Sequence, residues 1–171
     1  QDPGRQLLEV LRSMARAWEG TTARLLRQAK GAPADAGLGL VVQAMALGLA
    51  EAGADIAGLD ILDMTDTRAQ VEGLGRRYYS VETNLMEATP DSLSAIVADI
   101  VDTLGRVDIL LNNAGIIRRT PAIDFSIDDW DAVMNVNLKG AFHCMKVAAK
   151  AMMKQRFGRI VNISSVVGVS G

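Results

Sequence analysis

The sequence has few residues that bind metals or form covalent links. Its 171 residues include one cysteine, Cys144, and one histidine, His143. A single cysteine excludes an internal disulfide and fits a reducing compartment, and these two residues provide no cluster of metal ligands. Both lie within an apolar helical pattern. We therefore expect ordinary helix residues here and no metal site.

An excess of charge of one sign and a long apolar run are also missing. The formal net charge is -2, without a long basic run, which argues against binding to nucleic acid or an anionic membrane. The longest uncharged stretch, between Asp35 and Glu51, is shorter than the roughly 20 apolar residues of a spanning helix. The first residues lack the basic and apolar regions of a signal peptide. These features predict a cytoplasmic protein with a small-molecule substrate.

What is present is the pattern of an α/β domain. Hydrophobic residues make up 49% of the chain, and short apolar runs alternate with segments of helical period from Ala54 onward. The pattern predicts a doubly wound, Rossmann-like parallel sheet, incomplete, over 37–171, after a helical segment of unclear role at 1–36. Strands are expected at 55–61, 77–84, 107–113 and 159–164, and helices at 66–75, at 89–105 and from Ser126 onward.

The residues that follow the predicted strands are candidates for a ligand site, because ligands bind at the carboxyl ends of parallel strands. Asp60 ends the first strand, where its carboxylate could accept hydrogen bonds from a ribose and repel a 2'-phosphate. The alternative is a solvated loop acid. Asn84 ends the second strand, as a ligand residue or as an ordinary turn residue. The small residues of 112–115 would let a ring or ribose approach the backbone closely.

Asn137 falls on the apolar stripe of the helix that begins after Ser126, which predicts a buried amide. An unsatisfied buried amide costs about 1 to 3 kcal/mol, so we expect a partner or a bound water. The simpler alternative is a structural hydrogen bond to a neighbouring strand end.

Three linked motifs, LLNNAGI, NVNLKG and GRIVNISSVVG, follow the acidic strand end in this order. Together they resemble the short-chain dehydrogenase/reductase family, a Rossmann-fold group that uses nicotinamide dinucleotides. The resemblance covers residues from about 44 to 171 and implies NAD as the cofactor. It implies catalytic roles for Ser165, which would hydrogen-bond the substrate, and for Asn137, which would hold a relay water. It implies cofactor contacts by Asp60, Asn84, Leu85, Asn113, Ala114 and Gly115.

The finer pattern NNAGIIRR, with MALGLAEAGADI and LGRRYYS upstream, is similar to a subgroup that oxidises or reduces sugar acids such as 2-dehydro-3-deoxy-D-gluconate and 2-deoxy-D-gluconate. We hypothesise that Arg118 or Arg119 binds the substrate carboxylate, since a guanidinium can hold it through two hydrogen bonds. A solvated or subunit-interface arginine pair is the equally weighted alternative.

Two departures from the family pattern affect the expected activity. Neither of the two tyrosines begins the family's Tyr-x-x-x-Lys, since Tyr78 and Tyr79 are followed four positions later by Glu82 and Thr83. The resemblance implies that this motif would begin a few residues beyond Gly171. We therefore expect a C-terminally truncated chain without turnover of its own. A non-catalytic nucleotide-binding remnant or interaction module is the alternative function. For a full-length family member, the resemblance implies a homo-oligomer, commonly a tetramer.

The second departure is in the glycine-rich loop that would bind the pyrophosphate. Gly37 and Gly39 are retained as cofactor-binding candidates, but Pro33 stands where the family has its first glycine. Two interpretations stay open. Residues 37–42 form either the start of a lengthened helix or a substitute first strand.

Overall fold

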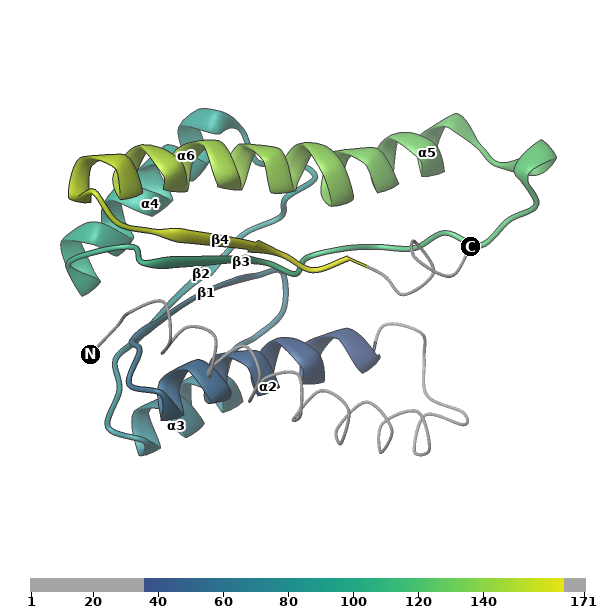
Figure 1. Ribbon diagram of the computed structural model, residues 1–171. Coiled ribbons are helices and arrows are strands. Elements are labelled where there is room, and N and C mark those ends of the chain that lie inside the picture. The colour runs from purple at the N-terminus through teal and green to yellow at the C-terminus, as the bar shows by residue number, and fades with distance from the viewer. Residues whose placement is uncertain (1–35, 165–171) are drawn as a thin grey trace. The chain divides into compact units, whose positions relative to one another are not determined.

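The computed structural model describes residues 36–164, with the side chains of 36–42 and Ala44 excepted. Helices and strands alternate along this part of the chain (Figure 1). In chain order the elements are α2 (Ala36–Glu51), β1 (Ile56–Asp60), α3 (Thr65–Gly73), β2 (Tyr78–Glu82), α4 (Pro90–Leu104), β3 (Ile109–Asn112), the 3-10 helix η1 (Ala122–Asp124), α5 (Ile127–Met134), the π-helix η2 (Asn135–Gly140), α6 (Ala141–Gln155) and β4 (Arg159–Asn162).

The strands pair in parallel, as predicted, and form two small sheets within the described range. In the β1–β2 pair, the amide of Ile56 donates to the Arg77 carbonyl (2.9 Å) and the amide of Thr83 donates to the Asp60 carbonyl (2.8 Å), so both strands run in one direction. In the other sheet, β3 and β4 are parallel from Ile109 opposite Arg159 to Asn112 opposite Asn162. The predicted parallel α/β fold is confirmed.

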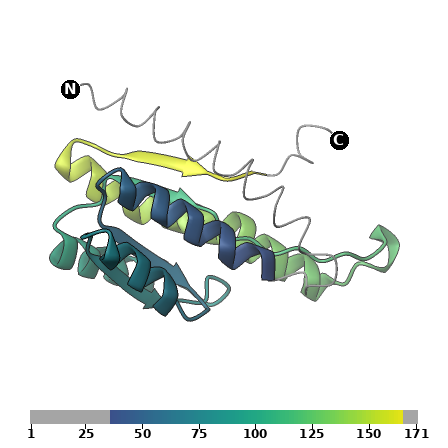
Figure 2. The ribbon, with the colours of Figure 1, turned by 90° about the horizontal axis from the view of Figure 1, so that it is seen from below.

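The chain divides into two compact units, each with its own apolar centre. Of the described residues, 36–58 and 63–80 belong to the first unit, and 59–62 and 81–164 to the second. In the first unit α2 and α3 lie side by side (Figure 2). Its core consists of Ala46, Ala50, Ile56 and Val71.

In the second unit, α6 packs against α4 and runs along the sheet of β3 and β4 (Figure 1). Its buried apolar side chains are Leu93, Ile100, Ala132, Val136, Val147, Ala148 and Met152. The signals read from the sequence fix the ends of α4. The Thr89 and Ser92 side chains form a capping box, and Gly105 ends the helix with a φ of 95°, which favours glycine.

Residues 37–42 lie in helix α2, so the interpretation as a lengthened helix is confirmed and that as a first strand is wrong. Tertiary contact stabilises this helix, because four of its residues lie in the core of the first unit or pack against it, namely Ala46, Leu47, Leu49 and Ala50. Among the described residues, no helix is long and apolar enough to cross a membrane.

Candidate functional site

The carboxyl ends of all the described strands belong to the second unit, so the candidate site can be described within one compact body. Asp60 ends β1, Asn84 follows β2, Asn113 follows β3, and Ser164 follows β4. This arrangement is the one expected for a ligand edge in a parallel α/β fold. Ser165, the predicted catalytic serine, lies outside the described residues.

Asp60 is half-buried at the end of β1. Its Oδ1 accepts a hydrogen bond from the Leu62 amide (3.1 Å), which holds the carboxylate next to the strand end. Within residues 36–164, no hydrogen bond engages its other oxygen, Oδ2. An oriented carboxylate with one open oxygen can accept a hydrogen bond from a ligand hydroxyl.

Asn84 makes the hydrogen bonds of a turn residue. Its Oδ1 accepts from the Met86 amide (3.0 Å), and its Nδ2 donates to Oε1 of Glu87 (3.0 Å). These bonds fit the turn alternative, and cofactor contact by Asn84 stays a prediction. The half-buried Leu85 follows and packs against Gly140 of η2.

The turn after β3 holds a polar atom that lacks a partner. Nδ2 of Asn113 is buried and makes no hydrogen bond to any described residue. A buried donor without an acceptor costs about 1 to 3 kcal/mol, so an acceptor from a ligand or a water would stabilise this turn. The orphaned donor therefore fits a polar ligand such as a dinucleotide.

Ala114 is exposed, and Gly115 leaves room beside the same turn. A Cβ added at Gly115 would come no closer than 3.5 Å to another group, the Oδ1 of Asn137, which is ordinary contact. The fold itself does not require glycine at this position. Any constraint on Gly115 must then come from something outside the described contacts, such as a ligand.

Asn137 lies in the π-helix η2, where its amide binds the backbone beyond β3. Its Oδ1 accepts from the Ile116 amide (2.8 Å), and its Nδ2 donates to the Ile116 carbonyl (2.9 Å). The predicted burial of this side chain is wrong, because Asn137 is exposed. A π-helix has hydrogen bonds between residues i and i+5. Its side chains therefore do not follow the α-helical spacing from which the apolar stripe was predicted.

This clamp on Ile116 is the structural alternative weighed from the sequence, a hydrogen bond next to a strand end. The role of Asn137 toward a relay water stays a prediction. π-turns inside longer helices often occur at functional sites, and η2 separates α5 from α6 at the place where Asn137 meets the turn after β3.

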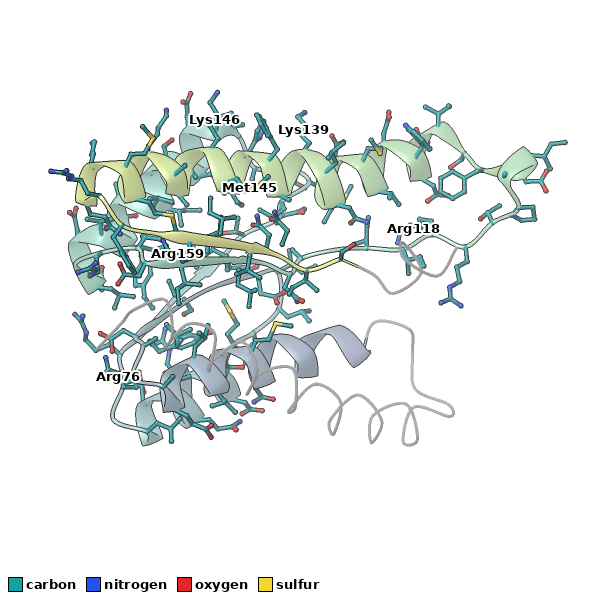
Figure 3. All side chains as sticks on the ribbon, viewed as in Figure 1. Arg76, Arg118, Lys139, Met145, Lys146 and Arg159 are labelled. Carbon is teal, nitrogen blue, oxygen red and sulfur yellow. The ribbon has the colours of Figure 1, made fainter. Side chains whose placement is uncertain are left out.

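The two arginines after this turn differ in their surroundings. Arg118 donates from Nε to Oδ1 of Asp129 (3.1 Å) and from Nη1 to the Ile117 carbonyl (3.3 Å). Figure 3 shows Arg118 on the segment between β3 and η1. Arg119 is exposed, and across residues 36–164 no ion pair or hydrogen bond engages its guanidinium. Arg119 is therefore the arginine that is available for an anionic ligand.

Asn112, the first residue of the predicted 112–115 turn, and Asn162, which the sequence reasoning did not single out, connect the ends of β3 and β4. They lie opposite each other in the parallel register, and Nδ2 of Asn112 donates to Oδ1 of Asn162 (2.8 Å). Nδ2 of Asn162 in turn lies 3.6 Å from the sulfur of Met145, which points from α6 toward β4 (Figure 3). An asparagine at the same position of both apolar strand runs was the signal for this pair.

Gly37 and Gly39 lie in the first turn of α2 and belong to the first unit. The structure gives them helical backbone, and their contact with a cofactor stays a prediction. The glycines of a pyrophosphate loop work by letting the backbone approach the phosphates ahead of a helix, and that loop would precede the described residues.

Known proteins share both the sequence and the fold of this chain. The model of the short chain dehydrogenase family matches residues 33–171. The 2-dehydro-3-deoxy-D-gluconate 5-dehydrogenase of Escherichia coli is 46% identical and that of Dickeya dadantii 44% identical, each over 80% of this chain and 53% of the relative. A crystal structure of NAD+-bound xylitol dehydrogenase superposes with a TM-score of 0.66 and 32% identity, over 74% of this chain and 51% of that one.

The chain thus spans about half the length of the curated relatives that it matches. The alternation of strands and helices, the asparagine-rich strand ends and the matched family model agree with one another. This chain belongs to the short chain dehydrogenase family.

Proposed function

We propose that the protein is an NAD-dependent oxidoreductase that transfers a hydride between the nicotinamide and a secondary alcohol or ketone of a sugar acid. The observation that carries the proposal is a pair of hydrogen-bonding groups at the carboxyl ends of the strands that have no partner among the described residues. Asp60 offers an oriented carboxylate oxygen, and Asn113 offers a buried donor without a partner among the described residues. The two relatives named above, both 2-dehydro-3-deoxy-D-gluconate 5-dehydrogenases, support a sugar-acid substrate.

The described residues would hold the dinucleotide through its ribose and adenine. Asp60 would accept from the ribose hydroxyls and disfavour a 2'-phosphate by charge repulsion. Asn84 and Leu85 would lie on the adenine side, and Asn113, Ala114 and Gly115 would line the cofactor. When bound, NAD supplies the acceptor for the hydride. Ser165 would hydrogen-bond the substrate oxygen, and Asn137 would hold a relay water.

The first test is binding of NAD to the 171-residue chain. Because a ligand that binds only the folded state stabilises it, NAD at about 100 times its Kd adds about 2.7 kcal/mol, which raises the melting temperature by several degrees. We expect NADP to bind at least about tenfold more weakly than NAD, a difference of about 1.4 kcal/mol. Calorimetric titration measures both Kd values.

Asp60→Asn keeps an acceptor for the Leu62 amide but removes the negative charge, so we expect the preference for NAD over NADP to shrink. Asp63→Asn is the matched control, since Oδ1 of Asp63 is engaged by the amide and hydroxyl of Thr65. Equal binding of NAD and NADP by the unaltered chain would contradict the proposed role of Asp60. Binding of neither would contradict NAD as the cofactor.

Arg119 provides a second test, this time of the substrate class. Since Asp129 already holds Arg118, we propose that Arg119 binds the substrate carboxylate. In the full-length protein, Arg119→Ala should raise KM for the sugar acid about tenfold and leave KM for a neutral sugar analogue unchanged, because only the acid loses an ionic hydrogen bond. Arg118→Ala is the control. An Arg119→Ala enzyme that still discriminates between the two compounds would overturn this assignment.

A second candidate function concerns the 171 residues by themselves, namely nucleotide binding without turnover. The observation that favours it is the place of the two tyrosines of the chain, Tyr78 and Tyr79, which begin β2 and are followed four positions later by Glu82 and Thr83 instead of a lysine. The absence of NADH formation by this chain with 2-deoxy-D-gluconate, together with measurable NAD binding, would support it.

The proposal also includes the cellular compartment and the oligomeric state of the protein. We propose a cytoplasmic protein, which the single half-buried cysteine supports. For the full-length protein we propose a homo-oligomer, with the tetramer of the family as the model. Exposed apolar side chains on the helices of the second unit support an assembly surface.

A further inference from the structure

The π-helix η2 contacts two segments that follow strands. Through Asn137 it binds the backbone of Ile116, beyond β3, at 2.8 and 2.9 Å. At its last residue, Gly140, it meets Leu85, which follows β2. Both segments belong to the second unit. The π-helix η2 thus contacts two of the loop segments at which we propose that the cofactor binds.

A side chain at Gly140 would fit only if its neighbours moved by a few tenths of an ångström. Gly140 is buried, and a Cβ placed on it would lie 3.2 Å from the carbonyl oxygen of Asn135 and 3.3 Å from Cβ of Leu85. Neither atom can rotate away, because a carbonyl oxygen and a Cβ are fixed directly to their backbones. Added bulk must therefore displace the turn of η2 or the backbone at Leu85. Close approach, rather than a positive φ, favours glycine here.

The backbone at Leu85 is part of a turn with its own hydrogen bonds. Asn84 accepts from the Met86 amide through its side chain (3.0 Å) and from the amides of Glu87 (3.1 Å) and Ala88 (3.0 Å) through its carbonyl. A displacement of Leu85 would strain these bonds. The protection of the three amides from solvent exchange therefore reports on the position of this turn.

We propose that Gly140 is a positioning residue for dinucleotide binding, because its close packing with Leu85 lets η2 hold the 84–88 turn in place. The inference rests on the proposed function, in which Asn84 and Leu85 lie on the adenine side of NAD. It assigns to Gly140 a role through Leu85 and no contact with the cofactor. Together with the Asn137 clamp, η2 then fixes the two loop segments that the cofactor would bridge.

The experiment compares Gly140→Ala with Gly73→Ala in the 171-residue chain. Gly73 is the matched control, because it also lies in a helix but a Cβ there meets nothing within 4 Å. We expect Gly140→Ala to speed hydrogen exchange at the amides of Met86, Glu87 and Ala88 at least about fivefold and to weaken NAD binding about tenfold by calorimetry, in line with the cost of overpacking. The control should change neither.

Unchanged exchange at these amides in Gly140→Ala would overturn the inference, and so would faster exchange with an unchanged Kd for NAD. If the unaltered chain binds no NAD, the proposed function fails and the cofactor role of Gly140 is overturned with it, while the exchange data separately report the packing. If Gly140→Ala does not fold, Leu85→Gly with Gly140 unchanged removes the side chain that packs on Gly140 and places no methyl group against the Asn135 carbonyl. Faster exchange at the amides of Met86, Glu87 and Ala88 in this variant supports the contact, and unchanged exchange overturns it.

Discussion

Asp55 lies immediately before β1, where its carboxylate connects the beginnings of two strands in the first unit. It accepts from the backbone amide of Arg77 (3.0 Å) and from Nε of Arg77 (2.9 Å), and it forms ion pairs with Arg76 (2.7 Å) and Arg77 (2.8 Å). The backbone hydrogen bond from Arg77, with the two guanidinium groups, lowers the pKa of Asp55 below its usual value of 3.8. The ionised form is therefore bound more strongly in the folded chain.

This geometry predicts a pH-dependent contribution to stability. Because the folded pKa lies below the unfolded value, the contribution is complete above about pH 5 and is lost as the pH falls through the lowered pKa. We expect Asp55→Asn to reduce the free energy of unfolding by about 1 to 2 kcal/mol at pH 7.

Urea unfolding of both proteins from pH 7 to pH 2 measures this difference. The difference should vanish at the acid end, where the carboxyl is protonated in both states. Asp102→Asn, an exposed helix position for which the structure shows no comparable pair, is the control. A difference that stays constant down to pH 2 would contradict this account of Asp55.

The environment of Cys144 disfavours a role for its side chain as a nucleophile or a metal ligand. Burial raises the pKa of this half-buried thiol, so it stays protonated at neutral pH. A thiol is a weak nucleophile and a poor metal ligand compared with the thiolate. The expectation from the sequence, an ordinary helix residue, agrees with this environment.

At the scale of the elements, the helical run from α5 to α6 contains one feature that the sequence predicts, its first residue, and one that it does not predict, a π-turn. Ser126 begins the run as expected, since its hydroxyl accepts from the Asp129 amide (3.0 Å). The π-turn over 135–140 was not expected, because the apolar spacing of this segment is that of a regular helix. The Asn137 amide binds Ile116, 21 positions away, and this contact holds the side chain outside the apolar stripe.

The Asn137 clamp leads to a prediction about this element. Asn137→Ala removes both hydrogen bonds to Ile116, so we expect hydrogen exchange at the Ile116 amide to become at least about tenfold faster and the free energy of unfolding to fall by about 1 kcal/mol. Asn135→Ala is a control in the same π-turn, since the structure shows no hydrogen bond from the Asn135 side chain to a described residue. Equal exchange rates in the two variants would argue against the clamp.

At the scale of the whole molecule, the second unit exposes apolar side chains along its outer helices. Trp130 on α5, Leu138 on η2, and Phe142 and Met153 on α6 are each more than half exposed. Lys139 and Lys146 point from the same run away from β4 (Figure 3). Several exposed apolar side chains mixed with charge on one helical run are typical of an interaction surface.

We therefore expect the 171-residue chain to self-associate as its concentration rises. Leu138→Ser should lower the weight-average mass in sedimentation equilibrium, because it removes apolar area from the contact. Lys139→Ser, next to it and also exposed, should lower it less. A chain that remains monomeric over the micromolar range would contradict this use of the surface.

The sequence alone determined the order and direction of the elements, because apolar periodicity and turn residues are local properties. Thr89, Pro90 and Gly105 mark the ends of α4 in the sequence as they do in the structure. The sequence motifs also carried the family resemblance that the family model later matched. The ends of the strands were also predicted to within two residues, as for β1, which ends at Asp60.

Only the tertiary structure decided which polar groups are already paired. Arg118 is engaged by Asp129 while Arg119 is exposed, and Asn84 uses its amide in a turn while Nδ2 of Asn113 is buried without a partner among the described residues. The close packing of Gly140 with Leu85 likewise joins positions 55 residues apart. Hydrogen bonds and close packing depend on distances between segments, and residue spacing along the chain does not specify them.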